Sequence, residues 1–128
     1  MPARRIDPAA GRQAVLDWCA DPAAPRQVVA TAVRYTLEEL ALTAPGRSVE
    51  VRVPPFGAVQ CIEGPRHRRG TPPAVIETDA ATWLALAVGD LTWEQARTFG
   101  SVRAGGERAD LSEWLPLLAR RAPGDGGA

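Results

Sequence analysis

The chain has 128 residues, of which 45% are hydrophobic and 23% are charged, and its 15 basic residues balance 15 acidic ones. This size predicts one domain with its own core, and the balanced charge argues against a general affinity for nucleic acid or anionic membranes. The two cysteines, Cys19 and Cys61, fall in no CxxC or His/Cys spacing, which excludes a disulfide framework and a zinc site. Because no apolar signal core or membrane-length run is present, we expect a cytoplasmic protein without stable membrane insertion.

Two helices are expected before any strand. Asp7 is a good N-cap for a helix over 8–20, and its following proline fits the first helical position. A second helix is expected over 25–44, again opened by a proline. Its apolar residues recur at helical spacing and predict an inward stripe, whereas Arg26, Arg34 and Glu38 are expected to face water. The stripe consists of Val29, Val33, Leu37 and Leu40.

From residue 47 the hydrophobic period changes to two. Valines at alternate positions predict a strand within 47–53 that has one buried face. A second strand is expected over 57–63, and the short connection between the two strands indicates a hairpin. The Gly- and Pro-rich stretch 64–73 is expected to be an exposed loop. It leads into a third strand over 74–78.

Helix signals then follow in close succession. Thr78 or Asp79 is expected to cap a helix that Gly89 ends. Thr92 and Gln95 have the spacing of a capping box, in which each side chain satisfies a backbone N–H of the other residue. A short helix is therefore expected to begin there.

The last part of the chain is less regular. A strand is expected over 99–104, followed by a Trp- and Leu-rich element over 111–121 whose regularity is limited by Pro116. The composition of 123–128 is typical of a disordered tail. We therefore expect a single domain over 1–122.

Residues 74–118 carry an ordered set of short motifs, and in their order and spacing they resemble the sterol carrier protein type-2 (SCP2-like) family, as a short bacterial stand-alone member. In element order the resemblance extends over 47–118. The motifs are Ile76-Glu77-Thr78-Asp79, Leu84-Ala85-Leu86, Gly89-Asp90-Leu91, Glu94-Gln95-Ala96, the set Phe99, Gly100, Val102 and Gly106, and Leu115-Pro116-Leu117-Leu118.

The resemblance implies an α/β (α+β) fold. After the two N-terminal helices, residues 47–121 would form a twisted, mainly antiparallel five-stranded sheet with helices packed on one face. An apolar cavity would then accept a fatty acyl chain, acyl-CoA or a sterol-like lipid. Such binding needs only the transfer of hydrocarbon out of water, about 0.8 kcal/mol per methylene. It needs no cofactor, metal or catalytic residue, so we expect a protein that is not an enzyme.

The same resemblance indicates which apolar residues would line the cavity. The slot is expected under Trp83 and Leu84 and is closed by the segment 114–118. For any single aromatic residue, packing in the core is the more common role. The candidate ligand-binding residues are Phe56, Trp83, Leu84, Phe99, Val102, Trp114, Leu115 and Leu118.

Arg66, Arg68 and Arg69 form a candidate anion site in the loop between the second and third strands, suited to a carboxylate, a CoA phosphate or a lipid head group. A solvated charged loop is the plainer interpretation. No aromatic residues interleave with these arginines, so nucleic-acid binding is not expected. His67 has no nucleophile or carboxylate near it in sequence, and Cys61 is typical of a small buried hydrophobe.

Three hypotheses are therefore open. The first is non-catalytic binding of a hydrophobic ligand. The second is a protein-interaction module of the same fold, with a filled cavity and no lipid. The third is an enzyme that uses His67 or Cys61, for which the sequence offers least support.

Overall fold

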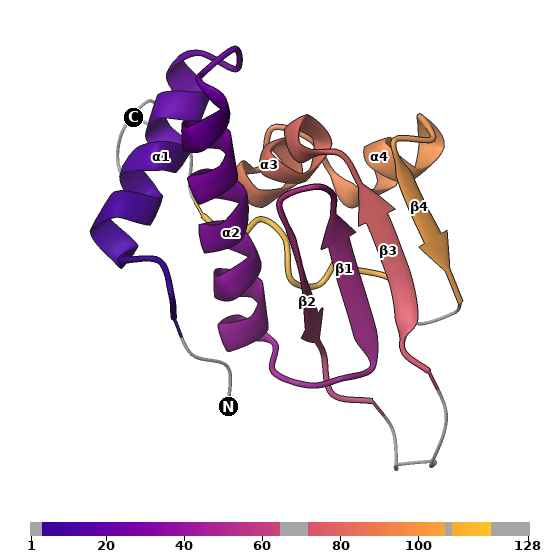
Figure 1. Cartoon of the computed structure of the whole chain (residues 1–128). Helices are drawn as coiled ribbons and strands as arrows, with labels where there is room; N and C mark the ends of the chain where they lie inside the picture. The colour runs from indigo at the N-terminus through magenta and orange to yellow at the C-terminus, as the bar shows by residue number, and fades with distance from the viewer. Residues whose placement is uncertain (1–3, 65–71, 107–108, 119–128) are drawn as a thin grey trace, which may run out of the picture.

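The structure, a computed structural model, describes residues 4–64, 72–106 and 109–118. Its centre is a four-stranded sheet in the order β2-β1-β3-β4 (Figure 1). β1 pairs antiparallel with β2 and parallel with β3, and β3 pairs antiparallel with β4. The strands are β1 (Val49–Val53), β2 (Gly57–Cys61), β3 (Ala74–Thr78) and β4 (Val102–Gly105).

Three of the described helices begin at side-chain caps that the sequence predicts. Asp7 accepts a hydrogen bond from the backbone N–H of Ala10, and Asp79 accepts one from Thr82. The capping box of Thr92 and Gln95 is present with both of its hydrogen bonds. The helices are α1 (Pro8–Ala20), α2 (Arg26–Thr43), α3 (Ala80–Val88) and α4 (Trp93–Thr98).

The expected fifth strand is wrong for the residues described, since 4–64, 72–106 and 109–118 contain four strands. Those four correspond to the strands expected from the sequence within 47–53, 57–63, 74–78 and 99–104, whereas the fifth came from the resemblance alone. The last strand begins at Val102 and not at 99, because Phe99 closes α4 and Gly100 adopts a left-handed φ of 73°.

The expected Trp- and Leu-rich element has no helix in its described part, 111–118. Residues 112–114 form a turn and the rest is irregular, consistent with a proline that can donate no backbone hydrogen bond at position 116. The loop arginines Arg66, Arg68 and Arg69, His67 and the tail 123–128 lie outside the described residues.

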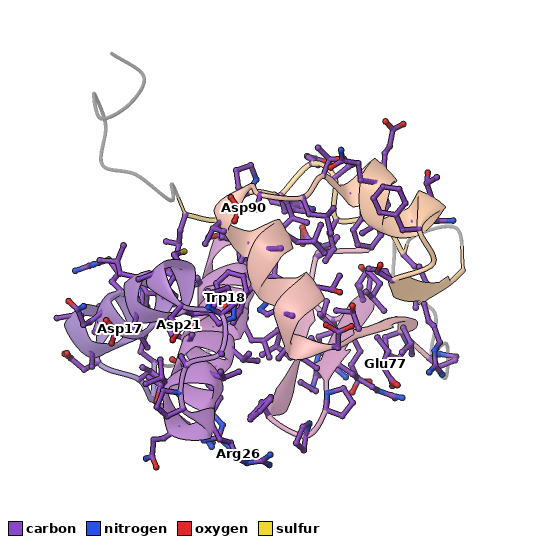
Figure 2. All side chains as sticks on the ribbon, turned by 90° about the horizontal axis from the view of Figure 1, so that it is seen from above. Asp17, Trp18, Asp21, Arg26, Glu77 and Asp90 are labelled. Atoms are coloured by element: carbon purple, nitrogen blue, oxygen red, sulfur yellow. The ribbon has the colours of Figure 1, made fainter. Side chains whose placement is uncertain are left out.

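The sheet has one buried face and one polar face. Val49, Val51 and Val53 are completely buried, and the strand register places Cys61 and Ile76 on the same side. The other side carries the ion pair of Arg52 and Glu50, with 3.3 Å between nitrogen and oxygen. Glu77 continues this polar face on β3 (Figure 2), and its register partner on β4 is Arg103. The alternation seen in the sequence therefore separates core from solvent correctly.

Helix α2 lies beside β2, at the edge of the sheet (Figure 1). Arg34 Nε donates to the Phe56 carbonyl at 2.9 Å near one end of β2. Just past the other end, the Ile62 N–H donates to the Ala44 carbonyl at 2.6 Å. The Cα of Gly57 faces α2, since a Cβ there would lie 3.4 Å from Leu37 Cδ1, an ordinary van der Waals contact. The edge strand is thus partly covered by a helix, one of the ways in which proteins protect a sheet edge.

Candidate ligand-binding groove

An open groove runs along the junction of α2 and β2. It has a volume of about 440 Å³, which lies within the range of small-molecule sites. Its apolar lining comes from three parts of the chain that are far apart in sequence. The apolar side chains that line it are Ile6, Leu37, Ala41, Phe56, Ala58 and Val59.

The N-terminal segment forms one wall of this groove, and two glutamates of α2 hold it in place. The Glu38 carboxylate accepts hydrogen bonds from the backbone N–H groups of Arg5 and Ile6, each at 3.1 Å. Glu39 accepts one from Arg4 and one from the Tyr35 hydroxyl, both at 2.9 Å. Arg5, Ile6 and Glu38 all line the groove, so the wall is fixed by hydrogen bonds made at the site itself.

The Tyr35–Glu39 contact also affects ionisation. The pKa of Tyr35 is raised, first by burial and then by its hydrogen bond to Glu39. The phenol therefore stays protonated and donates to the carboxylate well above neutral pH.

Strand β2 presents part of its backbone to the groove. Along an edge strand, alternate residues direct their N–H and C=O groups away from the sheet. The backbone next to both ends of β2 bonds to α2 or its C-cap: the Phe56 carbonyl accepts from Arg34, and the Ile62 N–H donates to the Ala44 carbonyl. Ala58 lies between these two ends and lines the groove. The backbone of the edge strand is therefore close to the groove.

The charged side chains of the groove are unevenly distributed. Arg5 and Arg34 line it together with one acidic residue, Glu38. A third cation, Arg26, lies at one end, with its guanidinium carbon 5.1 Å from the centre of the Phe56 ring. This end of the groove is therefore electropositive.

Seven of the eight candidate residues from the sequence lie in or against one hydrophobic core cluster, and Phe99 is the exception. Trp83 and Leu84 are fully buried, and Val102 is nearly so. Trp83 Nε1 donates to Thr36 Oγ1 at 2.8 Å, so its polar edge is satisfied inside the core. Phe99 is 68% exposed at the end of α4. Of the eight candidates, only Phe56 lines the groove.

The expected closing segment lies against α3. Trp114, Leu115 and Leu118 are half-buried and pack on the core. The backbone N–H groups of Leu117 and Leu118 both donate to the Ala87 carbonyl, at 2.9 and 3.0 Å. The segment thus covers the place where the sequence predicted a slot.

Several groove residues were missed by sequence reasoning. Arg34, Glu38 and Ala41 recur at helical spacing and share a face of α2, a signal that was present in the sequence. The sequence alone predicts that Arg34 and Glu38 face solvent, because no local pattern shows that β2 lies beside this face of α2. The contribution of Arg5 and Ile6 has no local signal at all.

A second pocket, of about 350 Å³, lies between β3, β4 and the start of α3. Its polar groups already serve the fold: the Asp79 carboxylate caps α3, and the Thr78 hydroxyl donates to the Ser101 carbonyl at 2.7 Å. We therefore do not treat it as a functional site.

Reactive groups are sparse in the described part of the chain. Residues 4–64, 72–106 and 109–118 contain no group of three or more His, Cys, Asp or Glu side chains that could hold a metal ion. Burial raises the pKa of the Cys61 thiol to about 12, which leaves little thiolate near neutral pH. Among the helices described, none has the length and apolar character needed to cross a membrane.

Together these features define a class: a small α+β protein with one polar sheet face and an apolar groove between a helix and an edge strand. Residues 25–117 match the model of the family described as bacterial SCP ortholog, and the chain belongs to that family. The match confirms the resemblance to sterol carrier protein type-2, and it covers α2, all four strands and most of the C-terminal segment. The N-terminal wall lies outside it. No curated protein matched the chain.

Proposed function

We propose that the protein binds a hydrophobic small molecule without transforming it, and that the α2–β2 groove is the binding site. The ligands in view are a fatty acyl chain, acyl-CoA or a sterol-like lipid. The observation that carries the proposal is the apolar lining of an open groove of about 440 Å³ in a member of the SCP family. A cytoplasmic location is part of the same proposal and rests on the sequence alone.

The groove is a better candidate than the slot expected under Trp83. Trp83 and Leu84 are completely buried, so a ligand there would have to displace packed side chains and the segment 114–118. Displacing a well-packed core costs several kcal/mol. The groove is already open, and each methylene placed against its apolar wall contributes about 0.8 kcal/mol when it is fully removed from water.

A catalytic role receives no support from this site. The described residues that line the groove include no His, Cys, Ser or Thr. They therefore offer no hydroxyl or thiol nucleophile and no imidazole base, and the one carboxylate, Glu38, already accepts hydrogen bonds from two backbone N–H groups. Simple binding is the activity that this lining supports.

The experiment is a titration of the purified protein with decan-1-ol and decanoate, followed by calorimetry and native mass spectrometry. Ala58→Trp places a large side chain at the groove and should weaken binding at least tenfold. Gln60→Trp is the matched control, because Gln60 is exposed on the same face of β2 and does not line the groove. Binding that is unaffected by Ala58→Trp would place the site elsewhere. No binding of either compound to the folded protein would refute the proposal.

A second candidate is a protein-interaction module. The observation that favours it is the closed inner core, in which Trp83, Leu84 and Leu111 are fully buried and the segment 114–118 packs over α3. The same titration decides between the two, because this candidate predicts an intact fold with no affinity for either decan-1-ol or decanoate.

A further inference from the structure

We propose that the α2–β2 groove selects hydrophobic ligands that carry a negatively charged head group, and that Arg34 and Arg5 bind this group. The inference rests on the proposed function and adds to it the chemical class of the ligand. It depends on the charged side chains of the groove. The binding of a hydrocarbon tail does not require these charges.

Arg34 is held in place at the groove. Its Nε donates to the Phe56 carbonyl at 2.9 Å, which fixes the plane of the guanidinium group. An arginine fork has further N–H donors on its two terminal nitrogens, in a geometry that suits a carboxylate or phosphate. Since both Arg34 and Phe56 line the groove, a head group bound there can leave its apolar tail against Leu37 and Val59.

Arg5 supplies the second cation, and Glu38 positions it. The Glu38 carboxylate accepts hydrogen bonds from the backbone N–H of Arg5 at 3.1 Å and of Ile6 at 3.1 Å. These bonds hold the backbone of Arg5 at the groove wall and leave its guanidinium group out of the interaction. The neighbouring Arg4 is engaged elsewhere, in an ion pair with Glu39 at 2.9 Å.

The remaining charges favour an anion as well. The groove lining contains two guanidinium groups and one carboxylate, and the acidic group already accepts two backbone hydrogen bonds. Arg26 lies on the Phe56 ring at 5.1 Å, and its side chain extends outward from the start of α2 (Figure 2). Its charge therefore adds to the positive potential at the same end.

The backbone of β2 offers another donor. Ala58 lines the groove on β2, an edge strand that has a neighbouring strand on one side only. Its N–H can donate to an anionic oxygen, and such charge-assisted hydrogen bonds are about twice as strong as neutral ones. A neutral hydroxyl can accept these hydrogen bonds but without the added strength of an anionic charge, and both arginines would repel a cationic head group.

Three ligands with the same ten-carbon tail test the proposal: decanoate, decan-1-ol and decylamine, each below its aggregation concentration. We expect decanoate to bind about tenfold or more tightly than decan-1-ol, and decylamine to bind most weakly. In the double variant Arg5→Gln/Arg34→Gln, the preference for decanoate should disappear, so that the ratio of the affinities for decanoate and decan-1-ol falls to about one. Added salt should reduce the preference in the natural protein.

Arg103→Gln is the matched control, because it removes a positive charge from β4 on the polar face of the sheet, away from the groove. It should leave the preference unchanged. Circular dichroism and thermal unfolding establish that each variant is folded.

Equal affinities for decanoate and decan-1-ol would overturn the head-group proposal and leave the proposed function standing. The same conclusion follows if the preference survives in the double variant or is lost in Arg103→Gln. If the folded protein binds none of the three compounds, both proposals fail together.

Discussion

Trp83 and Phe56 are aromatic residues that both lie close to α2, but their surroundings differ. Trp83 is completely buried, and Thr36 accepts a hydrogen bond from its indole nitrogen. Phe56 is half-buried at an open groove, under the guanidinium group of Arg26. Trp83 therefore has a packed ring and a hydrogen-bonded indole N–H without any ligand. The surroundings of Phe56 leave apolar surface and positive charge available, and that difference is why we assign binding to the groove.

The largest expected effect is a difference between the two aromatic residues in how far their substitution lowers the free energy of unfolding. Trp83→Ala should lower the free energy of unfolding by about 3 to 5 kcal/mol, because it leaves a cavity in the core. Phe56→Ala should cost about 1 kcal/mol, since part of the ring is already exposed, but it should weaken binding of decan-1-ol. Urea denaturation measures the first quantity and calorimetry the second.

Phe99→Ala is the control for the loss of an aromatic ring, because Phe99 is 68% exposed. Its effect on stability should stay within about 0.5 kcal/mol. A Trp83→Ala variant that is as stable as Phe99→Ala would contradict the packed-core interpretation.

A smaller change tests how the core satisfies its polar groups. Thr36→Val keeps the shape of the side chain and removes the oxygen that accepts the Trp83 indole N–H at 2.8 Å. A buried donor without a partner costs about 1 to 3 kcal/mol, so the free energy of unfolding should fall by that amount. In the background of Trp83→Phe, which has no indole N–H, the same substitution should cost clearly less. Equal costs in the two backgrounds would show that the hydrogen bond does not stabilise the fold.

The last expected effect, which is absent near neutral pH, is a pH dependence on the inner face of β2. Burial raises the pKa of Cys61 from 9.0 to about 12, so between these values the unfolded chain loses its thiol proton while the folded protein keeps it. The unfolded state then binds fewer protons, and stability must fall as the pH rises from 9 to 12. Cys61→Ala should make this decline less steep. Tyr35 is present in both proteins, so its own titration cancels in the comparison of slopes.

The sequence predicted the local structure well because the relevant signals are local. The alternating valines of β1, the Asp79 cap and the capping box of Thr92 and Gln95 each depend on residues a few positions apart, and the structure confirms them. The five-stranded sheet came from a resemblance in element order and is wrong for the residues described.

The groove could not be predicted in the same way. It requires α2 to lie beside β2 and the N-terminal segment to attach to Glu38, and the hydrogen bonds that do this join residues 22 and 32 positions apart. On α2, Arg34 and Glu38 have the spacing of a solvent-facing stripe. Charged side chains along an open groove can have the same spacing as side chains that face solvent, so this pattern does not distinguish the two cases. The family resemblance implied a cavity but drew attention to the region of Trp83, where the structure shows packing.

The most direct test of the groove assignment is a ¹H–¹⁵N NMR titration of the labelled protein with decan-1-ol. We expect the backbone amides of Gly57, Ala58 and Val59 to shift with a saturable dependence on ligand concentration, and the Trp83 indole N–H to stay in place. A shift of the Trp83 indole signal together with the amides of Leu117 and Leu118, while β2 is unaffected, would place the ligand under the C-terminal segment and contradict the assignment of binding to the groove.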